Sequence, residues 1–294
     1  MQQTTASVNT GIAPLTNVAL CLGTLKRAID RPRHLPGITV FYGPSGFGKS
    51  TAAACAIIQC RACYVQARSS WTRKAAHWEH DFSNREETFA RADQAADGKI
   101  IVRRGIELGE AMRDFAYADE LLSRLPEFDF VIGSQHQLSE KYDWNDLYFM
   151  PEATEQEARE QIADYLTLVL ETAKWGKFSV LGHLTLPLRY MNENHGMHMS
   201  FDGFEDEVAQ VFRALIENGC GIECNVNRGN TPLPDAKWLR LYHELSGEIV
   251  TIGTDAHTPE FVGMRARETQ ELLKSCGLNY VCTFEKKKPV FHKI

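Results

Sequence analysis

The chain repeats one pattern: a short apolar run, then a glycine, then a side chain that can bind a metal ion. The fullest example is residues 250–257, where the run closes at Gly253 and is followed by Asp255 and His257. Such a run predicts a buried β-strand, and side chains two residues apart leave it on the same side. Three earlier stretches share the design and end at Glu107, His136 and His183.

Between these strands lie segments with helical periodicity, which gives an α/β pattern. The expected helices cover residues 115–124, 154–172, 205–218, 234–245 and 266–276, and further strands are expected at 221–226 and 280–284. Alternation of this kind predicts a sheet or barrel of parallel strands with helices outside it. Barrel enzymes of this type carry their chemistry at the carboxyl ends of the strands. We therefore expect the carboxylates and imidazoles named above to share one rim.

The composition excludes several classes of protein. A formal charge of −6 over 294 residues makes nucleic acid an unlikely partner, because there is no basic surplus to displace counterions from phosphates. The sequence has neither a run of eighteen apolar residues nor a charged-then-apolar leader, so we expect no membrane association and a cytoplasmic location.

A second motif lies near the start of the chain. An expected strand at residues 38–42 runs into a glycine-rich loop with the full phosphate-loop spacing G-x-x-x-x-G-K-S, and an alanine-rich helix is expected after it. In this motif backbone N–H groups surround phosphate oxygens, the lysine reaches the terminal phosphates, and the serine can hold Mg²⁺. The motif predicts MgATP binding through Gly43, Gly46, Gly48, Lys49 and Ser50.

With the strand at residues 64–66 and the stretch 70–74, this opening resembles the start of a phage transposition ATPase of the AAA class. Turnover in such enzymes also needs a strand that ends in an aspartate, which holds Mg²⁺ through water. No clean apolar run ending in Asp-Glu follows within the next hundred residues. The loop therefore predicts nucleotide binding rather than hydrolysis.

From about residue 76 to 294 the chain resembles the polymerase-and-histidinol-phosphatase (PHP) superfamily, in particular the monofunctional histidinol-phosphate phosphatases. The motifs that carry this resemblance are residues 105–109 (GIELG), 132–136 (IGSQH), 181–184 (LGHL), 222–225 (IECN) and 252–257 (IGTDAH). The resemblance implies a distorted, TIM-like barrel of seven β/α units. It also implies hydrolysis of a small phosphate monoester, L-histidinol phosphate, to L-histidinol and phosphate.

The resemblance further implies a cluster of up to three divalent ions of zinc, manganese or iron. Glu107 would bridge two ions, and His136, His183, Asp255 and His257 would complete their shells. Such ions neutralise charge on the phosphate ester and activate water for attack on phosphorus. Arg189 and Arg228 lie where the family places arginines, whose guanidinium groups suit phosphate oxygens.

The chain departs from this family at its first strand, which carries a His-x-His pair in family members. No such pair lies on an expected strand here, and His77 takes the place of the second-strand histidine, with Ala76 where an acid is usual. Two accounts are open. Either the phosphate-loop unit replaces the missing barrel strand and helix, or residues 1–75 form a separate partial unit beside a truncated barrel at 76–294.

Three functions follow. The first is a metal-dependent phosphoric monoester hydrolase of the histidinol-phosphatase type, whose activity the missing ligands could impair. The alternative is an ATP-binding protein of the phage transposition type, with the barrel as a passenger. The third is a fusion that binds neither ligand, because each half is incomplete.

Overall fold

The computed structural model describes residues 64–68, 72–74, 77–79, 89–91, 93–94, 102–124, 128–255, 261 and 263–294. The strands are β1 (Tyr64–Arg68), β2 (Thr72–Lys74), β3 (His77–Glu79), β4 (Arg103–Gly109), β5 (Phe130–Ser134), β6 (Val180–Leu181), β7 (Gly221–Asn225), β8 (Val250–Gly253), β9 (Tyr280–Glu285) and β10 (Lys288–Lys293). The α-helices are α4 (Phe115–Arg124), α5 (Glu155–Trp175), α6 (Leu186–Leu188), α7 (Glu205–Glu217), α8 (Ala236–Glu244) and α9 (Ala266–Ser275). None of the described helices is long and apolar enough to cross a membrane.

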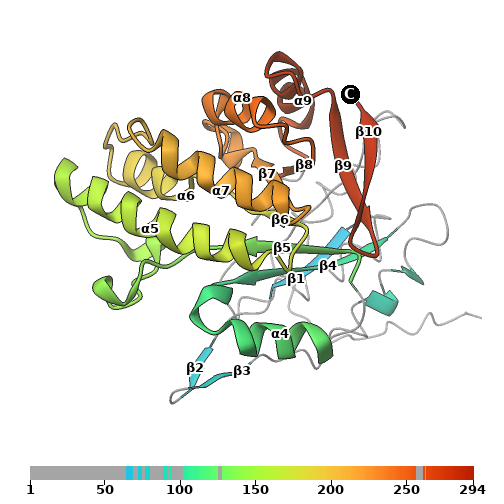
Figure 1. Ribbon diagram of the computed structural model, residues 1–294, viewed down its shortest axis with the longest axis horizontal. Helices are drawn as coiled ribbons and strands as arrows, with labels where there is room; N and C mark the ends of the chain where they lie inside the picture. Colours follow the sequence, from blue (N-terminus) through green and yellow to red (C-terminus); the bar gives the residue numbers. More distant parts are fainter. Residues whose placement is uncertain are drawn as a thin grey trace, which may run out of the picture.

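The centre of the structure is one curled sheet of parallel strands in the order β1-β4-β5-β6-β7-β8 (Figure 1). From β4 onward this is also the order of the chain, as expected when a helical segment connects each strand to the next. The α/β class and the parallel, TIM-like arrangement predicted from the sequence are therefore confirmed. The sheet has six strands within the described part of the chain and forms a partial barrel.

The edge strand β1 is relevant to whether the phosphate-loop unit replaces the missing barrel strand, which was the first account, or forms a separate unit at residues 1–75. It pairs in parallel with β4, from Tyr64 opposite Arg103 to Arg68 opposite Glu107. A strand assigned from sequence to the phosphate-loop unit thus lies in the same sheet as a strand of the barrel. The first account requires such pairing at this edge. The division between residues 75 and 76 remains a prediction.

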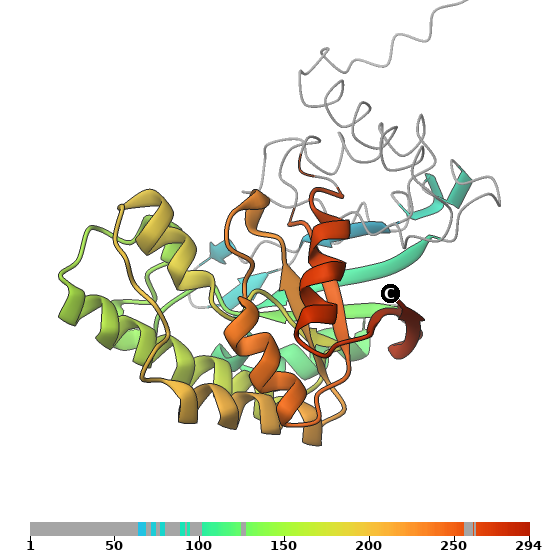
Figure 2. The same cartoon turned by 90° about the horizontal axis from the view of Figure 1, so that it is seen from above.

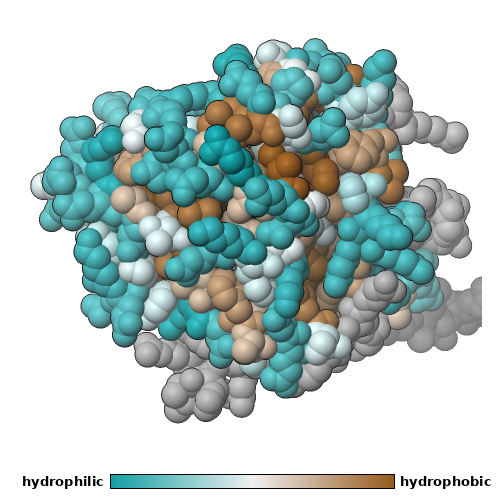
Figure 3. Space-filling model, in the orientation of Figure 1, coloured by the Kyte–Doolittle hydropathy of each residue, from teal (hydrophilic) through white to brown (hydrophobic). Residues whose placement is uncertain are grey.

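The outer face of the sheet packs against the helices, as Figure 2 shows from above. The helix α5 begins with a capping box, in which Thr154 and Glu157 bond each other's backbone N–H groups, and ends at Gly176 in the left-handed conformation. The buried apolar faces of α5 and α7 join the outer strand residues in one large core. The outward faces of these helices are largely hydrophilic (Figure 3).

The last strands correct one prediction. Residues 280–284 do form a strand, but β9 pairs antiparallel with β10 in a separate hairpin instead of extending the parallel sheet. The hairpin docks beside the beginning of β5, where Asp129 accepts hydrogen bonds from the backbone of Lys286 and Lys287. Its inner residues complete a second apolar cluster made of Phe130, Ile132, Val180, Cys282 and Phe284. Along β5 and β6 its residues alternate with residues of the large core, so this cluster lies on the opposite, inner face of the sheet.

Candidate metal site

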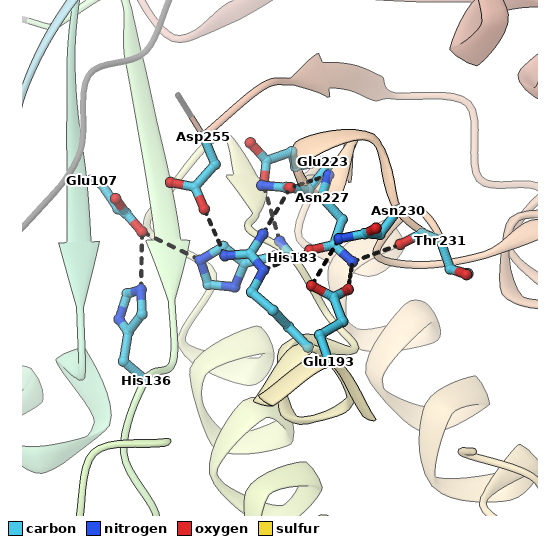
Figure 4. Close-up of polar contacts among 11 residues, drawn as sticks. Glu107, His136, His183, Glu193, Glu223, Asn227, Asn230, Thr231 and Asp255 are labelled. Atoms are coloured by element: carbon cyan, nitrogen blue, oxygen red, sulfur yellow. Dashed lines mark hydrogen bonds and ion pairs between the residues drawn. The ribbon is translucent and has the colours of Figure 1, made fainter. Parts of the chain in front are cut away.

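Three neighbouring strands deliver the side chains of the candidate site. Glu107 lies near the end of β4, His136 follows β5 by two residues, and His183 follows β6 by two. The Nε2 atoms of His136 and His183 lie 3.3 and 3.4 Å from the same oxygen, Oε1 of Glu107 (Figure 4). Glu107 thus sits between two imidazoles, as Figure 4 shows.

Burial makes these interactions strong. The three residues are only 4 to 6 % exposed. Burial by itself raises the pKa of Glu107, but the two imidazoles outweigh it and hold the pKa well below its ordinary value. Burial likewise opposes charge on His136, yet Glu110 and Glu107 raise the pKa of its imidazole to about 10. The carboxylate is therefore ionised, and positive charge is favoured beside it.

Two further carboxylates hold the histidines in place. The backbone N–H of His136 donates to Oε1 of Glu110 at 2.6 Å, and that of His183 donates to Oε2 of Glu223 at 3.0 Å. Glu223 needs the glycine of the repeated pattern, because a side chain at Gly253 would collide with its carboxyl group. Burial raises the pKa of Glu223. Glu223 lies in the IECN motif, for which no role was predicted, and Glu110 was not predicted; the signal for it in the sequence is a carboxylate directly after GIELG.

Asp255 belongs to the other side of the site. It follows β8, and its Oδ2 accepts a hydrogen bond of 2.8 Å from Nη1 of Arg189, whose side chain is 4 % exposed. The same guanidinium donates from Nε to Asn227 and from Nη2 to Asn225, at 2.6 and 3.1 Å. Arg189 thus connects the ends of β7 and β8 instead of facing an open cavity. Asn225 belongs to the IECN motif, whereas Asn227 was not among the predicted site residues.

The remaining predicted residues are placed only in part. Arg228 follows β7 with a left-handed backbone and is half-buried. His77 begins β3, which pairs with β2 outside the main sheet, and its side chain is not among those described. His257 lies outside the described residues, as do Gly43, Gly46, Gly48, Lys49 and Ser50. Their roles, including MgATP binding, remain predictions.

The donor set suits a divalent transition metal ion. Ligand atoms of Glu107, His136 and His183 all lie within 4.8 Å of one another, and all three residues are buried. One carboxylate with two imidazoles is a common set for zinc, manganese or iron. Buried carboxylate and imidazole groups of this kind are costly to bring together without a cation or shared protons. No other group of this kind is found in the part of the chain that the structure describes.

The chain matches a domain family, and the known proteins with similar sequences share a described activity. The family model of the PHP domain matches residues 76–227. Probable histidinol-phosphatases match from Thermotoga maritima (30 % identical over 127 residues, 42 % of this chain), Clostridium acetobutylicum (24 % over 203, 68 %) and Deinococcus radiodurans (29 % over 191, 65 %). The matched segments span 52, 76 and 70 % of these relatives, so the first is matched over about half its length.

A solved structure shares the fold. The crystal structure of histidinol phosphate phosphatase from Lactococcus lactis, complexed with zinc, L-histidinol and phosphate, superposes with a TM-score of 0.66 and 17 % identity, over 86 % of this chain and 98 % of that one. Together the fold and the site define an α/β protein of the partial-barrel type, with candidate metal ligands at its strand ends. The chain belongs to the PHP domain family.

Proposed function

We propose that the protein is a metal-dependent phosphoric monoester hydrolase of the histidinol-phosphatase type, which converts L-histidinol phosphate and water to L-histidinol and phosphate. The observation that carries this proposal is the convergence of Glu107, His136 and His183 from three adjacent strand ends in a chain of the PHP family. The names of the three relatives, and the zinc, L-histidinol and phosphate of the structural neighbour, support the substrate.

In this proposal Glu107, His136 and His183 hold a divalent ion, with zinc, manganese and iron as candidates. Asp255, His257 and His77 belong to the proposed ligand set as well, which leaves room for more than one ion. A divalent ion supplies charge neutralisation for the phosphate ester and activation of water at neutral pH. The side chains of Glu107, His136 and His183 are themselves buried, and their removal from bulk water strengthens the electrostatic interactions among them.

The two arginines take different parts. Arg189 has three of its N–H donors committed to Asp255, Asn225 and Asn227, and it orients these groups at the ends of β7 and β8. Arg228 is more exposed, and it is the proposed contact for the phosphate oxygens, because a guanidinium group pairs with them in a bidentate manner. A small phosphate monoester is thus bound between the metal ligands and Arg228.

The test is hydrolysis of L-histidinol phosphate by the full chain with Zn²⁺ or Mn²⁺ added, measured as phosphate release. We expect turnover that is lost on chelation and lost in Glu107→Gln, which removes the shared carboxylate charge. The control is Glu271→Gln, an exposed residue of α9 paired with Lys274, which should behave as the wild type. Zinc binding without any phosphate release from this substrate would refute the proposed activity.

A further inference from the structure

The imidazole ring of His136 is held by two carboxylates on opposite sides. Its Nε2 faces Glu107, and its Nδ1 lies 3.0 Å from Oε1 of Glu110. The same oxygen of Glu110 accepts the backbone N–H of His136 at 2.6 Å. One carboxylate oxygen therefore fixes both the main chain and the ring of this residue.

The chain positions Glu110 by a sharp turn at the end of β4. Its backbone N–H still donates to Ser134 on the neighbouring strand, but its φ is 53°, in the left-handed region that a non-glycine residue rarely adopts. The side chain is 10 % exposed. A strained backbone and a buried carboxylate are costly features, and such costs are retained where a specific geometry is needed.

His183 provides an internal comparison. Its Nε2 also faces Glu107, and a buried carboxylate, Glu223, also holds its backbone N–H. However, its second ring nitrogen, Nδ1, has no hydrogen-bond partner among the described residues. The two histidines are thus alike in their approach to Glu107 and differ in what orients the ring. Of these two rings, only that of His136 has a second carboxylate, among the described residues, on the nitrogen that faces away from Glu107.

We propose that Glu110 is a positioning residue, an inference that rests on the proposed metal site. Glu110 fixes the proton of His136 on Nδ1 and so directs the lone pair of Nε2 toward the ion. A carboxylate that accepts the second N–H of a ligand histidine fixes its tautomer and ring orientation and raises its basicity as a ligand. Glu110 itself binds neither the ion nor the substrate.

The experiment is a zinc titration of the full chain against a competing chromophoric chelator, with Zn²⁺ alone as the probe. Glu110→Gln keeps an oxygen for the backbone of His136 but removes the charge beside the ring. Loss of an outer carboxylate partner costs about 10- to 100-fold in metal affinity, and we expect zinc binding to weaken by that factor. Glu223→Gln, which changes the carboxylate that accepts hydrogen bonds from the backbone of His183 and from the side-chain amide of Asn225, is the matched comparison and should weaken binding less.

Three results would overturn the inference. One is a Glu110→Gln variant that binds zinc like the wild type. Another concerns the double variant. If Glu110→Gln lowers zinc affinity in the His136→Ala background as much as it does in the wild type, Glu110 does not act through His136, because a residue that acts through His136 has no effect without it. Independently of any variant, ¹⁵N shifts of zinc-loaded wild type should show His136 protonated at Nδ1 and bound through Nε2; the reverse assignment would overturn it.

The proposed activity can fail separately. If the wild type binds zinc as described and hydrolyses no phosphate monoester, the activity is refuted and the role of Glu110 stands. If the wild type binds no zinc, the metal site and the role of Glu110 are both refuted.

Discussion

Each side of the site has a buried carboxylate, and the two sides differ in the positively charged group that lies beside it. At the ends of β4, β5 and β6, the buried carboxylate Glu107 faces two imidazoles, whose charge depends on protonation. At the ends of β7 and β8, the buried carboxylate Asp255 faces Arg189, whose charge is permanent and whose pKa is raised further by this pairing, although burial opposes it. The first side can exchange protons for a metal ion, whereas the second carries its own cation.

This difference assigns different tasks to the two sides. We expect an ion to bind first at Glu107, His136 and His183, where imidazoles can release protons and become ligands. We expect the Arg189 network to act as structural support that keeps the ends of β7 and β8 together. A substitution that weakens metal binding on the first side should therefore leave the Arg189 network intact, and a substitution in that network should act mainly on stability.

The largest effect should come from removing the built-in cation. Arg189→Ala removes the guanidinium group that pairs with the buried carboxylate of Asp255, and breaking a buried pair in this way costs about 3 to 5 kcal/mol of unfolding free energy. Urea denaturation followed by circular dichroism measures it. The control is Arg213→Ala, an exposed arginine of α7, which should stay within about 0.5 kcal/mol of wild type. A loss below 1 kcal/mol for Arg189→Ala would contradict a structural role.

The next largest effect should be the stabilisation by zinc bound at Glu107, His136 and His183. At a zinc concentration about 100 times the Kd, the wild type should gain about 2.7 kcal/mol of stability by mass action. Glu107→Gln should abolish this gain, because it removes the charge shared by both histidines. Thermal melts with and without Zn²⁺ test this, and Arg213→Ala should retain the full gain. A gain that survives in Glu107→Gln would place the ion elsewhere.

Much of this fold could be predicted from the sequence because its signals are local. The apolar runs gave β4 to β8, and the five predicted helices appear within three residues at each end. The antiparallel hairpin β9–β10 was missed for a physical reason. Its two-residue turn, Lys286-Lys287, has positive φ at both positions, where a sequence normally signals the turn with glycine or asparagine.

The site divides in the same way. Glu107, His136 and His183 were predicted to share a rim because each follows an apolar run on a neighbouring strand, and the structure brings them together. The partner of Arg189 could not be predicted, because Asp255 is 66 residues away along the chain and no periodicity connects them. Glu110 was missed because its role depends on a left-handed turn that no glycine marks.

A milder change at Arg189 separates charge from geometry. Lysine keeps the positive charge but lacks the planar fork that reaches Asp255, Asn225 and Asn227 together. Arg189→Lys takes at least one donor away from these buried acceptors, and losing a donor to a buried acceptor costs about 1 to 3 kcal/mol. Equilibrium unfolding should place it between wild type and Arg189→Ala. If lysine were as disruptive as alanine, geometry and not charge would dominate this side of the site.

The smallest effect should mark the outer limit of the Arg189 network. Glu193 accepts hydrogen bonds from the side-chain amides of Asn227 and Asn230 (Figure 4). Glu193→Gln makes these bonds neutral and, because Glu193 is exposed, should cost no more than about 1 kcal/mol. Zinc affinity should not change, since no atom of Glu193 contacts the histidines in the described interactions. A zinc affinity that fell in Glu193→Gln would show that the two sides are coupled through Asn227 and Arg189, and the separation of their tasks would be wrong.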